Sequence, residues 1–95
     1  MTKADLISLI SDQTGSDKAE IKKIVEAFMY NIKGSLEKKE NVYLRGFGSF
    51  LVVKKAKKTA RDIRKNKSVV IPEHYAPKFK PVKSFVDDVK TNVKS

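Results

Sequence analysis

The chain has 95 residues, a formal net charge of +10, no cysteine and one histidine, His74. This length fits one domain with a small core, and the lack of cysteine excludes disulfides, a thiolate nucleophile and zinc fingers. A single imidazole leaves metal sites without partners, and the chain shows neither a signal peptide nor a long apolar run, so we expect a soluble intracellular protein without metal, cofactor or membrane partner.

Two helices are expected in the first 39 residues. Thr2 with Asp5 fits a capping box, and Gly15 ends the first helix near Thr14. A second start at Asp17 precedes a helix of about five turns. Its apolar residues are Ile21, Ile24, Val25, Phe28, Met29, Tyr30, Ile32 and Leu36. We expect them to be core residues, and the breadth of this face points to a dimer seam.

Strands are expected next. Val42–Leu44 and Ser49–Val53 read as two strands joined by a glycine-containing turn. The second strand runs without a breaker into Lys54–Lys67, the basic stretch, which holds eight basic residues, and Ser68–Ile71 returns as a third strand. This pattern predicts a long β-ribbon arm with Asn66 in a left-handed turn conformation, and a disordered basic loop is the alternative.

The last third of the chain is expected to be extended and then helical. Pro72, Pro77 and Pro81 exclude helix in that extended segment, and apolar residues from Val82 to Val93 return to helical spacing. The order helix, helix, three strands, helix predicts an α+β fold in one domain. Three aromatic residues are expected to be core, because aromatics that stack on DNA are exposed: Phe47, Phe50 and Phe79.

The positive charge is concentrated in one third of the chain. From Lys54 to Lys83 there are eleven Lys and Arg against two acids, whereas the other residues carry ten basic and nine acidic groups. Such a segment attracts a polyanion in a salt-dependent way, although an acidic protein is an alternative partner. An enzyme is not expected, because the one acid–base candidate, His74 beside Glu73, lies in an extended and solvent-exposed segment.

Four short features then follow in order: Gly46-Phe47-Gly48-Ser49-Phe50, Arg61, Ile71-Pro72, and Pro77-x-Phe79 followed by Lys83. In this order and spacing, after two amphipathic helices, the chain resembles the HU and integration host factor family of bacterial DNA-bending proteins, without gaps from Lys3 to about Lys90. The resemblance implies an intertwined homodimer, or a heterodimer with a paralogous chain, that bends double-stranded DNA with two minor-groove arms. It also implies a cytoplasmic, nucleoid-associated protein without a small-molecule substrate.

The family pattern divides the single domain, 1–95, into three parts. These are a helical dimerisation base (1–39), a three-stranded antiparallel sheet extended into the β-ribbon arm (40–81) and a C-terminal helix (82–95). We expect little sequence specificity. A site-specific bender of the integration host factor kind is the alternative, and a basic RNA-binding module is disfavoured because no aromatic residue lies within the basic stretch.

The resemblance and the charge pattern together predict the DNA contacts. They are Lys3, Arg45, Gly46, Gly48, Ser49, Lys54, Lys55, Lys57, Lys58, Arg61, Ile63, Arg64, Lys65, Lys67, Lys78, Lys80 and Lys83. Turn geometry alone explains Gly46 and Gly48 equally well. For Lys78 and Lys80 the equal alternative to a phosphate contact is a position on the solvated surface.

The sequence departs from the family at the tip of the arm. The common pattern there is Arg-Asn-Pro, and the matching residues are Arg61-Asp62-Ile63. Ile63 is apolar and stiff, so we expect it to replace proline as the intercalating wedge, with packing on the arm as the alternative. Asp62 brings a negative charge near the phosphates, where it either weakens binding or pairs with Arg61 or Arg64.

Overall fold

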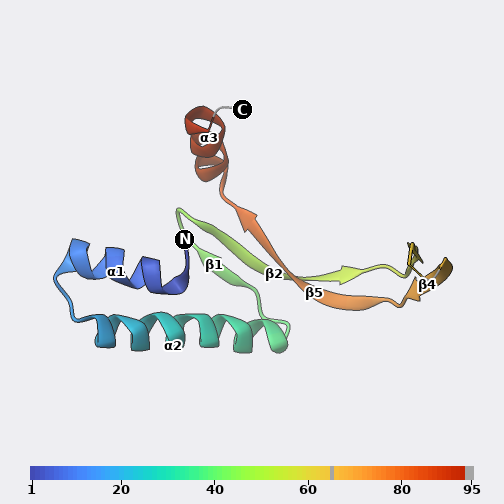
Figure 1. Cartoon of the computed structure of the whole chain (residues 1–95), viewed down its shortest axis with the longest axis horizontal. Coiled ribbons are helices and arrows are strands. Elements are labelled where there is room, and N and C mark those ends of the chain that lie inside the picture. The colour runs from blue at the N-terminus through green and yellow to red at the C-terminus, as the bar shows by residue number, and fades with distance from the viewer. Residues whose placement is uncertain (65, 94–95) are drawn as a thin grey trace. The chain divides into compact units, whose positions relative to one another are not determined.

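Three helices and five strands follow one another along the chain (Figure 1). The structure is a computed structural model that describes residues 1–64 and 66–93, and it forms two compact units, Met1–Ser35 and Leu36–Ser95. The elements are α1 (Lys3–Thr14), α2 (Lys18–Glu37), β1 (Val42–Leu44), β2 (Gly48–Lys55), β3 (Lys58–Asp62), β4 (Lys67–Ile71), β5 (His74–Pro81) and α3 (Lys83–Asn92). The α+β class and all three expected helices are confirmed.

The capping box predicted for α1 is present. The Asp5 amide donates to the Thr2 hydroxyl at 3.2 Å, and the Thr2 amide donates to the Asp5 carboxylate at 2.8 Å. These bonds favour the ionised carboxyl and hold the pKa of Asp5 below its usual range. At the other end, Gly15 takes the left-handed conformation (φ 75°) and its amide donates to the Ser11 carbonyl, as local helix rules require.

The apolar faces of the two N-terminal helices are largely uncovered. Among the large apolar side chains of the described residues, only Ile7 and Ile21 are buried. Ile24 is 66% exposed and Phe28 is 50% exposed, and Met29 is also exposed. The expectation that the α2 residues form an ordinary core is therefore wrong for one chain by itself, because a core at these positions needs a second surface to cover them.

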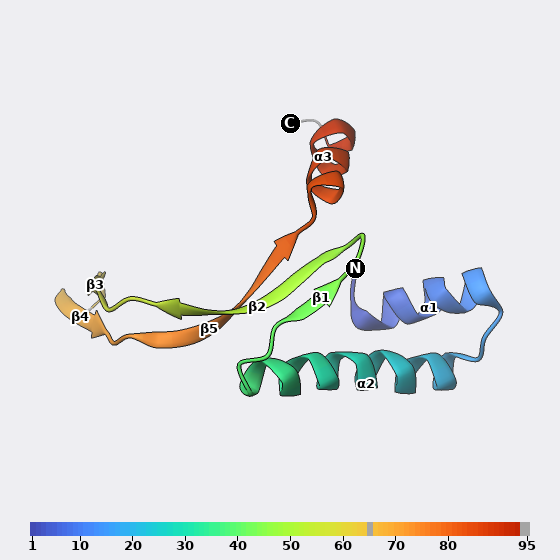
Figure 2. The same cartoon turned by 180° about the vertical axis from the view of Figure 1, so that it is seen from behind.

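A three-stranded antiparallel sheet has the order β1-β2-β5 (Figure 2). Its third strand is β5, which pairs with β2 along its whole length, and not Ser68–Ile71 as the sequence predicted. The expectation failed because two prolines inside a segment normally argue against a strand.

The sheet accepts both prolines because of their register. Pro77 lies opposite Val52, whose N–H donates at 3.0 Å to the Asn41 side chain on the side of β2 that faces away from β5. In an antiparallel pair both residues of such a rung point their N–H groups away from each other, so the missing N–H of Pro77 removes no ladder bond. Pro81, opposite Gly48, is four residues further along β5 and has the same orientation.

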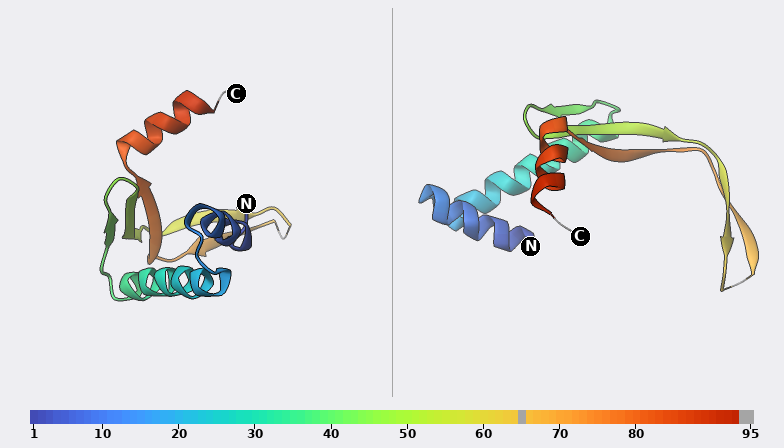
Figure 3. Two further views of the ribbon diagram at one scale, coloured as in Figure 1. Left: turned by 90° about the vertical axis from the view of Figure 1, so that its left-hand side faces the viewer. Right: turned by 90° about the horizontal axis from the view of Figure 1, so that it is seen from above.

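The hairpin β3–β4, called the arm from here on, forms a second, two-stranded sheet. The expected continuous ribbon is interrupted, since Ala56 and Lys57 separate β2 from β3 and Pro72 and Glu73 separate β4 from β5. We call this double break the elbow, and the strands change direction there (Figure 3, right). The turn prediction is confirmed at Asn66, which is left-handed with φ 51°.

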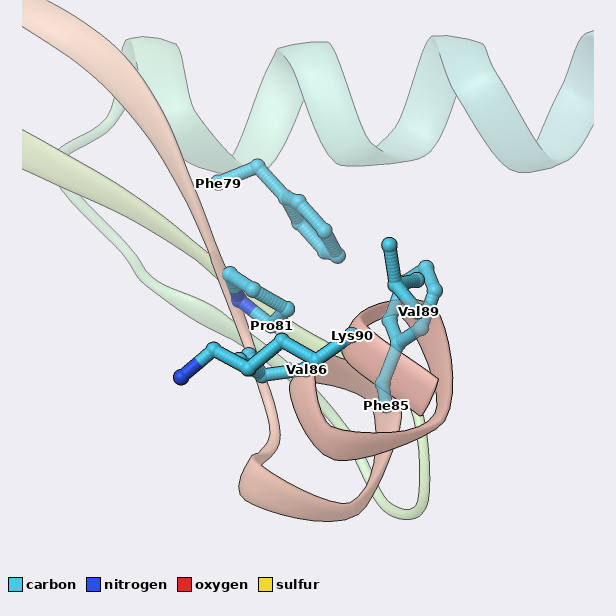
Figure 4. A pocket seen from close by; sticks show the side chains of 6 residues that line it. All are labelled: Phe79, Pro81, Phe85, Val86, Val89 and Lys90. Atoms are coloured by element: carbon cyan, nitrogen blue, oxygen red, sulfur yellow. The ribbon is translucent and has the colours of Figure 1, made fainter. Parts of the chain in front are cut away.

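An aromatic cluster joins the sheet to α3. The ring centroids of Phe47 and Phe79 lie 5.1 Å apart, those of Phe50 and Phe79 5.0 Å, and those of Phe47 and Phe85 5.6 Å. Contrary to the core expectation, Phe47 is still 46% exposed and Phe79 is 36% exposed. Beside the cluster is an apolar hollow of about 290 Å³ lined by Phe79, Pro81, Phe85, Val86, Val89 and the stem of Lys90 (Figure 4).

Candidate nucleic-acid interface

One face of the sheet collects the predicted phosphate contacts of β2 and β5. Ser49 lies opposite Lys80, and Leu51 lies opposite Lys78. Because directly opposed residues share a face and alternate residues change face, Ser49, Lys78 and Lys80 are on the side away from Phe50 and the aromatic cluster. The sheet thus has one face with the aromatic cluster and an opposite face with Lys78 and Lys80, which is called the cationic sheet face.

The turn between β1 and β2 needs both of its glycines for structural reasons. Gly46 has φ 80°, a conformation that side chains rarely adopt. A Cβ on Gly48 would lie 2.6 Å from the Lys80 carbonyl oxygen, so only glycine lets β5 approach here. Arg45 is exposed at this turn. These geometries explain both glycines without a ligand, and their role in binding stays a prediction.

The start of α3 carries an uncompensated positive potential. Its N-cap residue, Val82, has no side chain that can accept from the free amides, and no acid occupies the first turn. Lys83 is the first helical residue. Free amides, the positive end of the helix dipole and a lysine favour an anion at this end, and the phosphate contact at Lys83 stays a prediction.

The arm does not gather its cations on one face. The β3–β4 register puts Arg61 opposite Ser68, while Lys58 lies opposite Ile71 and Lys67 opposite Asp62. By strand alternation Arg61 shares a face with Thr59, Ser68 and Val70, and Lys58 and Lys67 lie on the other face. One face therefore offers a lone guanidinium among small side chains, which suits a narrow groove. The other face offers lysines. The predicted contact Lys65 lies outside the described residues.

The tip of the arm is held by two side-chain hydrogen bonds. The Arg61 guanidinium donates to the side-chain oxygen of Asn66, which joins the two strands just before the turn. The Asp62 carboxylate accepts the backbone N–H of Arg64 at 3.0 Å, so its charge serves the turn. Between these bonds Ile63 is 91% exposed, so packing on the arm does not explain it.

The elbow holds a second group of predicted contacts. Lys54 pairs with Glu73 at 2.8 Å. A hollow of about 370 Å³, called the elbow pocket from here on, is lined by Lys55, Ala56, Lys57, Lys58 and His74. The described residues that line this pocket include no acid, and the carboxylate of Glu73, the neighbour of His74 in sequence, is engaged by Lys54.

The remaining predicted contact, Lys3, belongs to the helical unit. Its ammonium group lies 3.0 Å from the Glu26 carboxylate, and this hydrogen bond and charge lower the pKa of Glu26. Lys3 also lines a groove of about 410 Å³ with Lys18 and Lys22 of α2, two residues that the sequence interpretation did not select. Their spacing of four residues at the start of a helix is the signal that could have identified them.

The described residues contain neither a metal-ligand cluster nor a membrane-spanning helix. Across residues 1–64 and 66–93, no three His, Asp or Glu side chains come together as metal ligands. Within the same ranges, the helices are too short or too polar to span a bilayer. His74 is exposed, as expected, and its neighbour Glu73 is paired with a lysine rather than with the imidazole.

Comparisons with known proteins agree with this surface. The family model described as bacterial DNA-binding protein matches residues 1–90. The DNA-binding protein HU of Thermotoga maritima is 38% identical over 90 residues, which are 95% of this chain and all of the relative, and that of Thermus thermophilus is 34% identical, covering 95% and 93%. An Anabaena HU–DNA co-crystal structure has a TM-score of 0.86 at 25% identity, covering 94% of this chain and 97% of that one. The structure of Thermotoga maritima HU gives 0.67 at 30% identity, covering 94% and 98%.

Proposed function

The chain belongs to the HU family of bacterial DNA-binding proteins, which are structural proteins rather than enzymes, and we propose on that basis that it is a dimeric architectural protein that bends double-stranded DNA. Its working place is the bacterial nucleoid, in the cytoplasm. The observation that carries the proposal is the arm, a hairpin without a core of its own that projects from a sheet with a lysine-bearing face.

The uncovered apolar surface supports the dimer. Phe28, Met29 and Tyr30 are exposed on α2, and the apolar hollow beside α3 is unfilled. A second copy, or a closely related chain, covers such surfaces at no cost in polar desolvation, and residues 1–39 then act as the dimerisation base. Two chains present two arms, which is what a clamp on a duplex requires.

The division of labour within the interface follows from the faces described above. The cationic sheet face, the start of α3 and the groove at Lys3 offer cations and free amides to phosphates, which position the duplex. The Arg61 face of the arm enters the minor groove, where the potential is most negative. Ile63 inserts at a base step, and the energy of the added contacts offsets the cost of unstacking.

The salt dependence of binding tests this proposal. A dimer that neutralises on the order of eight phosphates gives a slope of about −7 in log affinity against log salt concentration. We expect this slope from fluorescence anisotropy with a labelled duplex. Lys80→Gln, present twice per dimer, should flatten the slope by about 2. Lys33→Gln, with the same charge change on an exposed position of α2, is the matched control and should leave it unchanged.

A slope near −1 would contradict wrapping, since so few released counterions mean one local contact. Single-stranded RNA that displaces the protein from duplex DNA at equal nucleotide concentration would favour the RNA-binding alternative. Footprints on several unrelated duplexes separate unspecific binding, which we propose, from the site-specific mode.

A further inference from the structure

The elbow pocket contains the chain's only histidine in an otherwise permanently cationic setting. His74 is directly opposite Lys55 at the last residue pair of β2 and β5, and Lys57 and Lys58 are the other lysines of the pocket. The acidic neighbour Glu73 pairs with Lys54, and the Lys39 ammonium lies over the ring of the adjacent Tyr75, 4.3 Å from the ring centroid.

The hydrogen bonding of His74 fixes its neutral tautomer. Its Nδ1 atom lies 2.9 Å from the Pro72 carbonyl oxygen. A carbonyl oxygen only accepts, so the proton of the neutral ring must be on Nδ1. In the neutral ring Nε2 then carries a lone pair and can only accept a hydrogen bond. It becomes a donor when the ring takes up a second proton.

A phosphodiester has only acceptor oxygens, so the neutral ring has nothing to donate to it and the imidazolium does. We propose that the elbow pocket binds a phosphate of the DNA backbone and that His74 is a ligand of that phosphate only when protonated, so that DNA binding takes up a proton. This inference rests on the proposed function and adds to it a dependence of affinity on pH between about pH 5 and about pH 8.

The sign and size of the effect follow from charge. A phosphate about 4 Å from the imidazolium, largely in water, favours the charged ring about fivefold. Affinity should therefore rise as pH falls, by about that factor for each pocket that holds a phosphate. The effect should shrink at high salt, because the pocket is open to solvent.

Nuclear magnetic resonance gives the direct test, because the ring protons of a single histidine are unambiguous. We expect the midpoint of the His74 titration to move to higher pH when a duplex of about 30 base pairs is bound, compared with the free protein. An unchanged midpoint would overturn the inference. Inorganic phosphate at the same phosphate concentration should give a much smaller shift. An equal shift would mean that the pocket serves free phosphate, and would also overturn it.

A second test measures the affinity for duplex DNA at two pH values. Between about pH 8 and about pH 5.5 wild type should gain about fivefold per occupied pocket over His74→Gln, which cannot take up the proton. His74→Gln retains every other titratable group of the chain and therefore serves as the internal control. His74→Lys, with a fixed positive charge, should bind tightly at both pH values. If the affinities of wild type and His74→Gln depend equally on pH, the inference is wrong. If wild type does not bind duplex DNA at either pH, the proposed function itself is wrong.

Discussion

Replacing Ile63 with alanine should separate bending from binding. Ile63 is 91% exposed, so its truncation should change the free energy of unfolding of the free protein by no more than about 0.5 kcal/mol. In the complex the same side chain is removed from water, because it inserts between the bases of one step. The substitution removes three carbon atoms, and at about 0.8 kcal/mol for each the wedge loses about 2 kcal/mol per arm.

That loss is comparable with the few kcal/mol needed to unstack a step, and it favours the straight complex about 30-fold per arm. Energy transfer between dyes at the two ends of a duplex of about 30 base pairs should therefore fall, while affinity, carried by phosphate contacts, falls less. Val69→Ala, which shortens an exposed side chain on the face of the arm away from Arg61, is the matched control and should keep the bend.

Ile63→Pro restores the residue that the family pattern has at this position and should bend at least as well as wild type, since an apolar and stiff side chain is what the step requires. An Ile63→Ala complex with the same energy transfer as wild type would refute the assignment of Ile63 as the wedge. So would a Val69→Ala complex that loses as much transfer as Ile63→Ala.

The remaining predictions concern the bonds at the tip of the arm. Arg61→Ala should weaken binding on all sequences alike, and Asn66→Gly, which keeps the left-handed turn but removes the acceptor for Arg61, should reproduce part of that loss; an Asn66→Gly protein with wild-type affinity would show that the Arg61–Asn66 bond does not position the guanidinium. Asp62→Asn keeps the oxygen that accepts the Arg64 amide and removes the negative charge, so at low salt it should tighten binding about fivefold, an effect that titration in higher salt should abolish; unchanged affinity at low salt would place this carboxylate far from any phosphate.

Features governed by neighbours in sequence were predictable. Thr2 and Asp5 satisfy each other within one turn, Gly15 ends α1 in the left-handed conformation with a bond from its amide to the Ser11 carbonyl, and Asn66 tolerates the left-handed conformation of the arm turn. Such choices depend on the backbone within three or four residues, which a single sequence displays in full.

Features governed by pairing were not. The prolines of β5 looked like strand breakers because their acceptability depends on the register against β2 and on the Asn41 side chain that takes up the Val52 amide. Phe47 shows a similar limit, because an aromatic residue that stays exposed in one chain has the same sequence signal as one that the chain buries. The candidate site shows the same limit, because the sequence gives the charges of the arm but not which face of the ribbon each one occupies.

The two prolines of β5 have a further consequence for how the ribbon finds its alignment. Sliding β5 by one residue along β2 would turn Pro77 and Pro81 inward, remove two ladder hydrogen bonds at about 1 kcal/mol each, and move Phe79 onto the lysine-bearing face. The shifted register is thus less stable for two reasons: it loses backbone hydrogen bonds, and it takes Phe79 out of the aromatic cluster. The missing N–H groups of Pro77 and Pro81 therefore select the register in which Lys78 and Lys80 lie on the same face of the sheet.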